Sequence, residues 1–118
     1  MRQFKRSSRV GEQVLRDISE LVGTGLSDET PGMITFTRVR VTDDLRSATI
    51  YYSCLGAQEK QREVAGYLER EKKRIRHLVG KNLRLRHIPE FYFKFDPSVE
   101  EGIKIERLLN EIKSDTEE

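Results

Sequence analysis

The sequence predicts an α+β fold in which helices cover one face of a three-stranded sheet. Apolar residues recur at every third or fourth position in three segments, which is the period of an amphipathic helix. Two other regions, residues 34–54 and 83–95, alternate apolar and polar residues as strands do. The predicted order is helix, strand, strand, one long helix or two shorter ones, strand, helix. One layer of helices on one sheet buries all of these apolar faces together.

The first helix is expected over residues 9–23. Its apolar positions have helical spacing, and Gly23 and Gly25 end it. These apolar residues are Val10, Val14, Ile18, Leu21 and Val22. Residues 26–33 have no apolar period and contain turn-forming residue types, so we expect a loop there.

The next two strands are expected to form an antiparallel hairpin around a turn at residues 43–46. In the first strand the apolar residues change parity between Phe36 and Val39, which indicates a β-bulge or a strand buried unevenly on its two faces. The second strand alternates regularly, so one face is expected to carry Ala48, Ile50, Tyr52 and Cys54.

A long helix is expected over residues 58–79, with Gly80 as its C-cap. Its apolar stripe contains one charged residue, Glu71, so either the helix bends there or the carboxylate reaches water at an edge. The last strand region spans residues 83–95, and Pro89 within it indicates an edge strand or a break.

A final helix is expected after a capping box formed by Ser98 and Glu101. Its apolar residues, which we expect to be buried, are Ile105, Leu108, Leu109 and Ile112. A chain of 118 residues fits one domain. We expect a basic arm at residues 1–8, one domain at 9–112 and an acidic flexible tail at 113–118.

Cys54 is the only cysteine, which excludes an intrachain disulfide and a multi-cysteine metal site. We expect its side chain to be a small buried hydrophobe rather than a reactive thiol. No stretch of about 20 apolar residues, the length of a membrane-spanning helix, occurs in the chain. The basic N-terminus is not followed by the apolar core of a signal peptide. The sequence therefore predicts a soluble, cytoplasmic protein.

Charge is distributed unevenly, although the formal net charge is only +2. Residues 1–16 hold five basic side chains and one acid, and residues 69–87 hold eight basic side chains and two acids. Residues 97–118 reverse the sign, with seven acids and three bases. Basic clusters of this kind are typical of phosphate-binding surfaces, and the alternative is a solvated helix face.

The basic clusters supply the candidate RNA-binding residues. On the long helix, Lys72, Lys73 and Arg76 are expected to point away from the apolar stripe. Arg84 and Arg86 are expected on the strand face opposite Leu83 and Leu85. The complete set is Lys5, Arg6, Arg9, Lys72, Lys73, Arg76, Lys81, Arg84 and Arg86.

Two tyrosines are further candidates. Tyr51 and Tyr92 would form a stacking platform for single-stranded bases if they shared the open sheet face with Arg84 and Arg86. The alternative is that both are ordinary half-buried strand aromatics.

Three blocks of the sequence resemble the bacterial ribosome-binding factor A family, and their order and spacing cover residues 9 to about 110. The first block contains Arg9-Val10, Glu12 and Ile18. The second runs from Val39 to Leu45 and continues through Ala48, Ile50, Tyr51 and Ser53. The third contains Ile75-Arg76, Leu78-Val79-Gly80-Lys81, Leu83-Arg84-Leu85-Arg86, Ile88-Pro89-Glu90-Phe91, Phe93 and Asp96.

This resemblance implies a type II KH-like fold, and a cytoplasmic, non-enzymatic factor that needs no cofactor. It implies binding to the small ribosomal subunit and its RNA, assistance in late maturation and leading-end trimming of that RNA, and support of growth in the cold. We expect a monomer with no membrane partner, no metal and no small-molecule substrate. The family's basic surface would place Arg76, Lys81, Arg84 and Arg86 at or near RNA.

The sequence departs from these patterns in two ways. A standard KH domain clamps the nucleic-acid backbone with a GxxG loop, and no two glycines here are three positions apart. The family resembled has an Ala-x-Gly kink between two helices instead. The corresponding residues here are Glu71-Lys72-Lys73, which leaves open whether the helix bends and how.

Two other classes of function have weaker support. For an enzyme, Asp43 and Asp44 would have to act with His77 or His87, but Asp is common in turns and no metal-ligand spacing supports the pair. Gly80-Lys81 also lacks the rest of a phosphate-binding loop. A protein-interaction adaptor that docks through its acidic C-terminal helix is the second alternative.

Overall fold

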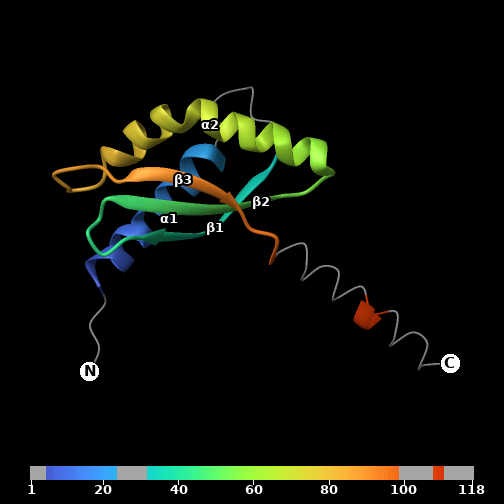
Figure 1. Ribbon diagram of the computed structural model, residues 1–118, viewed down its shortest axis with the longest axis horizontal. Coiled ribbons are helices and arrows are strands. Elements are labelled where there is room, and N and C mark those ends of the chain that lie inside the picture. The colour runs from blue at the N-terminus through green and yellow to red at the C-terminus, as the bar shows by residue number, and fades with distance from the viewer. Residues whose placement is uncertain (1–4, 24–31, 99–107, 111–118) are drawn as a thin grey trace.

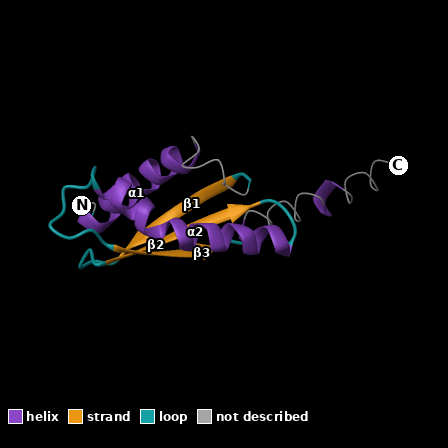
Figure 2. Ribbon diagram, turned by 90° about the horizontal axis from the view of Figure 1, so that it is seen from above, coloured by secondary structure: helices purple, strands orange, loops and turns teal. Residues whose placement is uncertain are grey.

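The computed structural model describes residues 5–23, 32–98 and 108–110. Five elements follow one another: α1 (Arg6–Gly23), β1 (Ile34–Val41), β2 (Ser47–Cys54), α2 (Gln58–Gly80) and β3 (Glu90–Phe95). The sheet has the order β1-β2-β3, with β1 and β2 antiparallel and β2 and β3 parallel. Both helices lie on the same face of this mixed sheet (Figures 1 and 2). The predicted α+β, type II KH-like arrangement is therefore confirmed.

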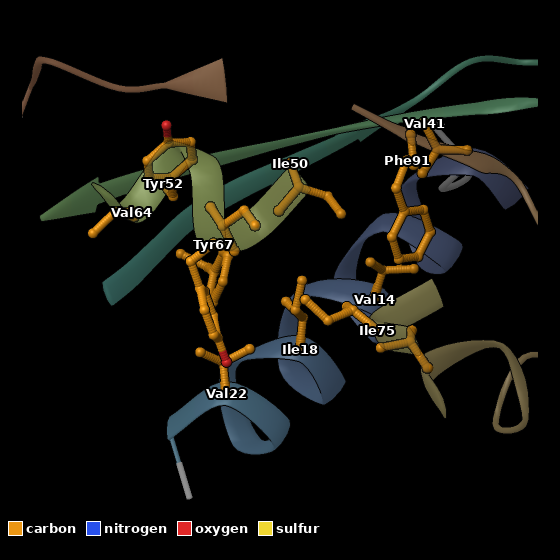
Figure 3. Packing of buried hydrophobic residues seen from close by; sticks show 14 of the residues in the cluster. Val14, Ile18, Val22, Val41, Ile50, Tyr52, Val64, Tyr67, Ile75 and Phe91 are labelled. Atoms are coloured by element: carbon orange, nitrogen blue, oxygen red, sulfur yellow. The ribbon is translucent and has the colours of Figure 1, made fainter. Parts of the chain in front are cut away.

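The hydrophobic core lies between the helix layer and the sheet. Figure 3 shows Val14 and Ile18 of α1, Ile75 of α2, Ile50 of β2 and Phe91 of β3 pointing toward one another, and all five are fully buried. Burying one such side chain contributes about 1.5–3 kcal/mol. The helical and alternating patterns in the sequence thus identified the faces that pack together.

Helix α1 begins at Arg6, three residues before the predicted start. The carbonyl oxygen of Lys5 accepts hydrogen bonds from the amides of Ser8 and Arg9, at 3.1 and 3.3 Å, and this forms the first turn. Ser7 is also buried. The apolar pattern begins only at Val10, so it could not reveal this turn.

The predicted bulge in β1 is confirmed. Phe36 pairs with Tyr52 and Arg38 pairs with Tyr51, which leaves Thr37 as the extra residue. One extra residue moves every later side chain to the other face, so Phe36 and Val39 both face the helices.

The hairpin turn is held by its own polar side chains. Asp44 Oδ1 accepts hydrogen bonds from the Thr42 hydroxyl at 2.6 Å and from the Arg46 amide at 3.0 Å. These two bonds lower the pKa of Asp44 below its usual value, and the bond from the Thr42 hydroxyl makes the larger contribution. Leu45 has a φ of 61°, a left-handed conformation that is uncommon for residues other than glycine.

Helix α2 continues through Glu71 without a break (Figure 1). The Glu71 side chain is one-quarter exposed and lies 3.7 Å from Arg74, so its carboxylate reaches the edge of the helix. Gly80 is the last helical residue and not a left-handed C-cap, since Lys81 follows with a φ of −59°. Gly80 lets Ile88 pack closely against the helix end, because a Cβ there would lie 2.8 Å from Ile88 Cδ1 and the Ile88 side chain would have to shift.

The last strand is shorter than predicted. Only Glu90–Phe95 pairs with β2, and residues 81–89 form a loop between α2 and β3. Pro89 cannot donate to a strand ladder, and pairing starts at the next residue. The edge position predicted for this strand is confirmed. The buried side chain of Leu83 produced the strand-like pattern within the loop.

Most of the predicted final helix lies outside the described residues. Residues 108–110 are helical, but Leu108 and Leu109 are each 58% exposed, so the prediction that they are buried is wrong. Cys54 is buried, as predicted. None of the described helices is both long and apolar enough to span a membrane.

Candidate nucleic-acid interface

The two basic clusters of the sequence meet at one end of the molecule. Lys5, just before α1, lies 3.7 Å from Asp43 in the β1–β2 turn. Arg46, in the same turn, accepts a hydrogen bond through its carbonyl from the Glu90 amide at the start of β3. Both views show the start of α1, this turn and the 81–89 loop at the same end (Figures 1 and 2). Segments some 80 residues apart in sequence therefore contribute to one surface.

We call this surface the basic end. Its side chains are exposed, and they come from three segments. Residues 5–9 contribute Lys5, Arg6 and Arg9, the β1–β2 turn contributes Arg46, and residues 73–86 contribute Lys73, Lys81, Arg84 and Arg86. Arg46 was not among the predicted residues, because it stands alone in sequence and no cluster count includes it.

The C-terminal half of α2 forms a hollow in the basic end. Lys73, His77 and Lys81 follow one another at intervals of four residues, so they share one side of the helix end. Together with Arg76, Gly80 and Ile88 they line a hollow of about 520 Å³. Most of its lining surface is apolar, and three of its six residues are lysine or arginine.

Arg76 is held by the backbone of the 81–89 loop and does not point freely into solvent. Its Nε donates to the Pro89 carbonyl at 2.8 Å, and its Nη2 donates to the Ile88 carbonyl at 2.5 Å. The Glu90 carboxylate lies 3.4 Å from the same Nη2. Arg76 therefore ties the 81–89 loop to α2 and fixes where β3 begins.

Lys72 is also partly covered, with a side chain only 26% exposed. Its Nζ lies 3.2 Å from a Glu69 carboxylate oxygen and 5.7 Å from the centre of the Tyr92 ring. Lys72 thus lies beside β3, whereas Lys73 belongs to the hollow at the helix end.

Arg84 and Arg86 lie in the 81–89 loop and not on a strand. The stacking platform that would combine them with Tyr51 and Tyr92 on the sheet is therefore not formed. Pro89 and the Arg76 hydrogen bonds keep this part of the chain out of the sheet. Both arginines are exposed and belong to the basic end.

The sequence interpretation missed two exposed cations on β1, Arg38 and Arg40. The Arg38 guanidinium lies 4.1 Å from the centre of the Tyr51 ring on β2. Both arginines also line a hollow of about 320 Å³ with Lys5, Ser8 and Asp43 at the start of α1. Counting charges by segment overlooks them, but the alternation of Arg38 and Arg40 with Val39 and Val41 would have revealed them.

Asp96 connects the two edges of the sheet. Its amide donates to the Tyr52 carbonyl at 2.7 Å, and its carboxylate accepts from the Thr37 hydroxyl at 2.7 Å and the Ser98 amide at 3.0 Å. Hydrogen bonds from Ser98 and then from Thr37 hold the pKa of Asp96 below its usual value of 3.8. The bulge residue of β1 is thus joined to the chain that leaves β3.

Removing the Thr37 hydroxyl is expected to raise the pKa of Asp96 toward 3.8. When folding lowers the pKa of a carboxyl group, that group stabilises the fold at pH values above its unfolded pKa. The stabilisation is lost as the pH falls through the folded pKa. The Thr37→Val variant should therefore lose less stability than wild type between pH 5 and pH 2. An NMR titration of the Asp96 carboxyl group checks the shift, and an unchanged pKa in the variant contradicts it.

Among the described residues, no three His, Cys, Asp or Glu side chains are grouped so that they could hold a metal ion. Asp44 is engaged in the turn, and Asp43 lies beside Lys5 and accepts a 3.5 Å hydrogen bond from the Ser7 hydroxyl. Asp44 therefore holds the turn together, and Asp43 joins the turn to the start of α1.

Comparison with known proteins assigns the chain to a family. The family model of ribosome-binding factor A matches residues 6–109. Ribosome-binding factor A of Geotalea daltonii is 43% identical over 111 residues, which cover 94% of this chain and 90% of the relative.

Solved structures show the same fold. The solution NMR structure of a Thermotoga maritima protein is 31% identical, has a TM-score of 0.66, and covers 80% of this chain and 90% of that one. A Thermus thermophilus ribosome binding factor A homology model, fitted into the cryo-EM map of its complex with the 30S subunit, is 20% identical with a TM-score of 0.63. It covers 77% of this chain and 96% of that one. The chain belongs to the ribosome-binding factor A family.

Proposed function

We propose that this protein is a non-enzymatic ribosome assembly factor that binds the small ribosomal subunit through its RNA, in the cytoplasm. Its role is to assist late maturation of the small-subunit RNA, including trimming at the leading end, and to support growth in the cold. Family membership supports this proposal, as does the Thermus thermophilus relative fitted into a 30S complex. The observation that carries it is the meeting of two basic clusters at one end of the fold.

The proposed RNA contacts are the lysines and arginines of the basic end. Lysine supplies a point charge to a phosphate, and arginine can grip two phosphate oxygens at once. Lys73 and Lys81 are separated by about 12 Å along the helix axis, so they contact different phosphates. Lys72 contributes from the side of β3, and Arg76 contributes mainly by fixing the loop that carries Arg84 and Arg86.

Co-sedimentation tests the partner. The purified protein is mixed with isolated small subunits, large subunits or transfer RNA and separated on a sucrose gradient. We expect it to travel with small subunits and to remain unbound with the other two. Equal association with large subunits contradicts the proposal.

Genetic complementation tests the role in maturation. The gene is placed in a bacterium that lacks its own ribosome-binding factor A, and growth in the cold and the leading end of the small-subunit RNA are measured. We expect the unprocessed precursor to decline and cold growth to recover. Persistence of the precursor, with the protein expressed and bound to small subunits, contradicts the proposed role.

A further inference from the structure

The face of the sheet opposite the helices carries a regular set of cationic and aromatic side chains. We propose that this open sheet face binds two consecutive nucleotides of a single-stranded RNA segment, as a second RNA site separate from the basic end. We define the open sheet face by Arg38 and Arg40 of β1, Thr49 and Tyr51 of β2, and Tyr92 and Lys94 of β3. The proposal rests on the RNA-binding function proposed above.

The strand register arranges these six residues in two rows across the sheet. In one row, Arg40 pairs with Thr49, and Thr49 pairs with Tyr92. In the other, Arg38 pairs with Tyr51, and Tyr51 pairs with Lys94. Because residues two apart on a strand are separated by about 6.6 Å, each row can serve one nucleotide. Each row contains one tyrosine and at least one cation.

The bulge at Thr37 puts the two arginines on this face. Without the extra residue, Arg38 and Arg40 would point toward the helices, and Val39 would face solvent. The 2.7 Å hydrogen bond from Thr37 to Asp96 fixes the bulge to the chain beyond β3. The fold therefore holds Arg38 and Arg40 in place on the outer face.

The cations of the open sheet face form no ion pair within the described residues, and the Arg38 charge acts on the Asp96 carboxylate at longer range. Among the described residues, no acidic oxygen lies within 4.0 Å of a charged nitrogen of Arg38, Arg40 or Lys94. The nearby Asp96 carboxylate accepts hydrogen bonds from Thr37 and Ser98. Three cations on a surface of six residues attract an anionic polymer.

The aromatic rings supply the stacking surfaces. Tyr92 is 51% exposed, and Lys72 approaches its ring from α2. The Arg38 guanidinium lies over the Tyr51 ring, 4.1 Å from its centre, so on that side of the ring the stacking surface is the arginine plane. Single-stranded bases stack on tyrosine rings and on arginine planes alike.

The composition of the face favours RNA over a protein partner. It contains no aliphatic side chain, whereas the centre of a stable protein interface is apolar and depleted of charge. The hollow lined by Lys5, Arg38 and Arg40 lies between this face and the start of α1. A strand of RNA can therefore continue from the open sheet face toward the basic end.

The test measures the affinity for a fluorescein-labelled octauridine RNA by fluorescence anisotropy. Tyr92→Ala is expected to weaken binding about tenfold because it removes a stacking partner, whereas Tyr92→Phe keeps the ring and should change affinity less than about twofold. Arg38→Gln with Arg40→Gln should make the slope of log K against log salt concentration less negative by about 1.4. The control Arg16→Gln removes an exposed cation of α1 and should change neither quantity.

The outcomes separate this site from the basic end. Unchanged affinity in Tyr92→Ala, with octauridine binding lost when Lys73, Lys81, Arg84 and Arg86 become glutamine, overturns the second site and leaves the proposed function intact. If the wild-type protein binds neither octauridine nor small subunits, both the second RNA site and the proposed function are overturned. If Tyr92→Ala or the double arginine variant binds small subunits more weakly but keeps the wild-type octauridine affinity, the face is a protein contact and the proposal is overturned. Lys94→Gln serves as a further variant if circular dichroism shows that another substitution unfolds the chain.

Discussion

Replacing Arg76 with methionine is expected to lower the free energy of unfolding by about 2–3 kcal/mol. Each of its two hydrogen bonds from a charged donor would contribute about 1.5–3 kcal/mol if shielded, but the side chain is 35% exposed, so water replaces part of both. The guanidinium donates to the carbonyls of Ile88 and Pro89, which have no other partner among the described side chains. Methionine keeps the apolar stem and loses both donors. Urea unfolding followed by circular dichroism measures the change.

Arg74→Met is the matched control for this variant. Arg74 lies two residues away on α2, is 57% exposed and lies 3.7 Å from Glu71. A pair of this kind on a helix surface contributes about 0.3–0.5 kcal/mol. Equal destabilisation by the two substitutions contradicts the structural role assigned to Arg76.

Neutralising four cations of the basic end is expected to weaken binding to small subunits about a thousandfold at roughly 0.1 M salt. Each lost phosphate contact makes the slope of log K against log salt concentration less negative by about 0.9. The variant changes Lys73, Lys81, Arg84 and Arg86 to glutamine. All four side chains are exposed, so the thermal midpoint should stay within a few degrees of wild type. Titration with labelled subunits measures the affinity.

A second variant with the same loss of charge separates position from net charge. It changes Arg16, Lys60, Arg62 and Arg70 to glutamine, and these residues lie on α1 and α2 outside the basic end. We expect it to bind small subunits within about fivefold of wild type, because long-range charge contributes little at this ionic strength. A similar loss in both variants would mean that net charge, and not the basic end, determines binding.

The sequence predicted the layers of the fold because burial leaves a periodic pattern. The shift in parity between Phe36 and Val39 revealed the bulge, and the shared parity of Phe91, Phe93 and Phe95 gave the face of β3 that packs on α2. The parallel pairing of β2 and β3 was not predicted, since alternation gives the faces of a strand and not its direction.

The role of Arg76 could not be predicted, because its partners are backbone carbonyls 12 and 13 residues away that any sequence would offer. The strand assigned to residues 83–86 was wrong because a loop that buries Leu83 imitates the alternation of a strand. The candidate site was predicted as two separate clusters. Only the folded chain brings Lys5 and Arg9 to the same end as Lys81 and Arg86.

The most direct test of the central claim is the salt dependence of small-subunit binding, measured for wild type and for the variant with glutamine at 73, 81, 84 and 86. If these four side chains neutralise phosphates, the slope of log K against log salt concentration becomes less negative by about 3 in the variant. Each lost phosphate contact accounts for about 0.7–0.9 of this change. Parallel lines for the two proteins would contradict the claim that the basic end binds RNA.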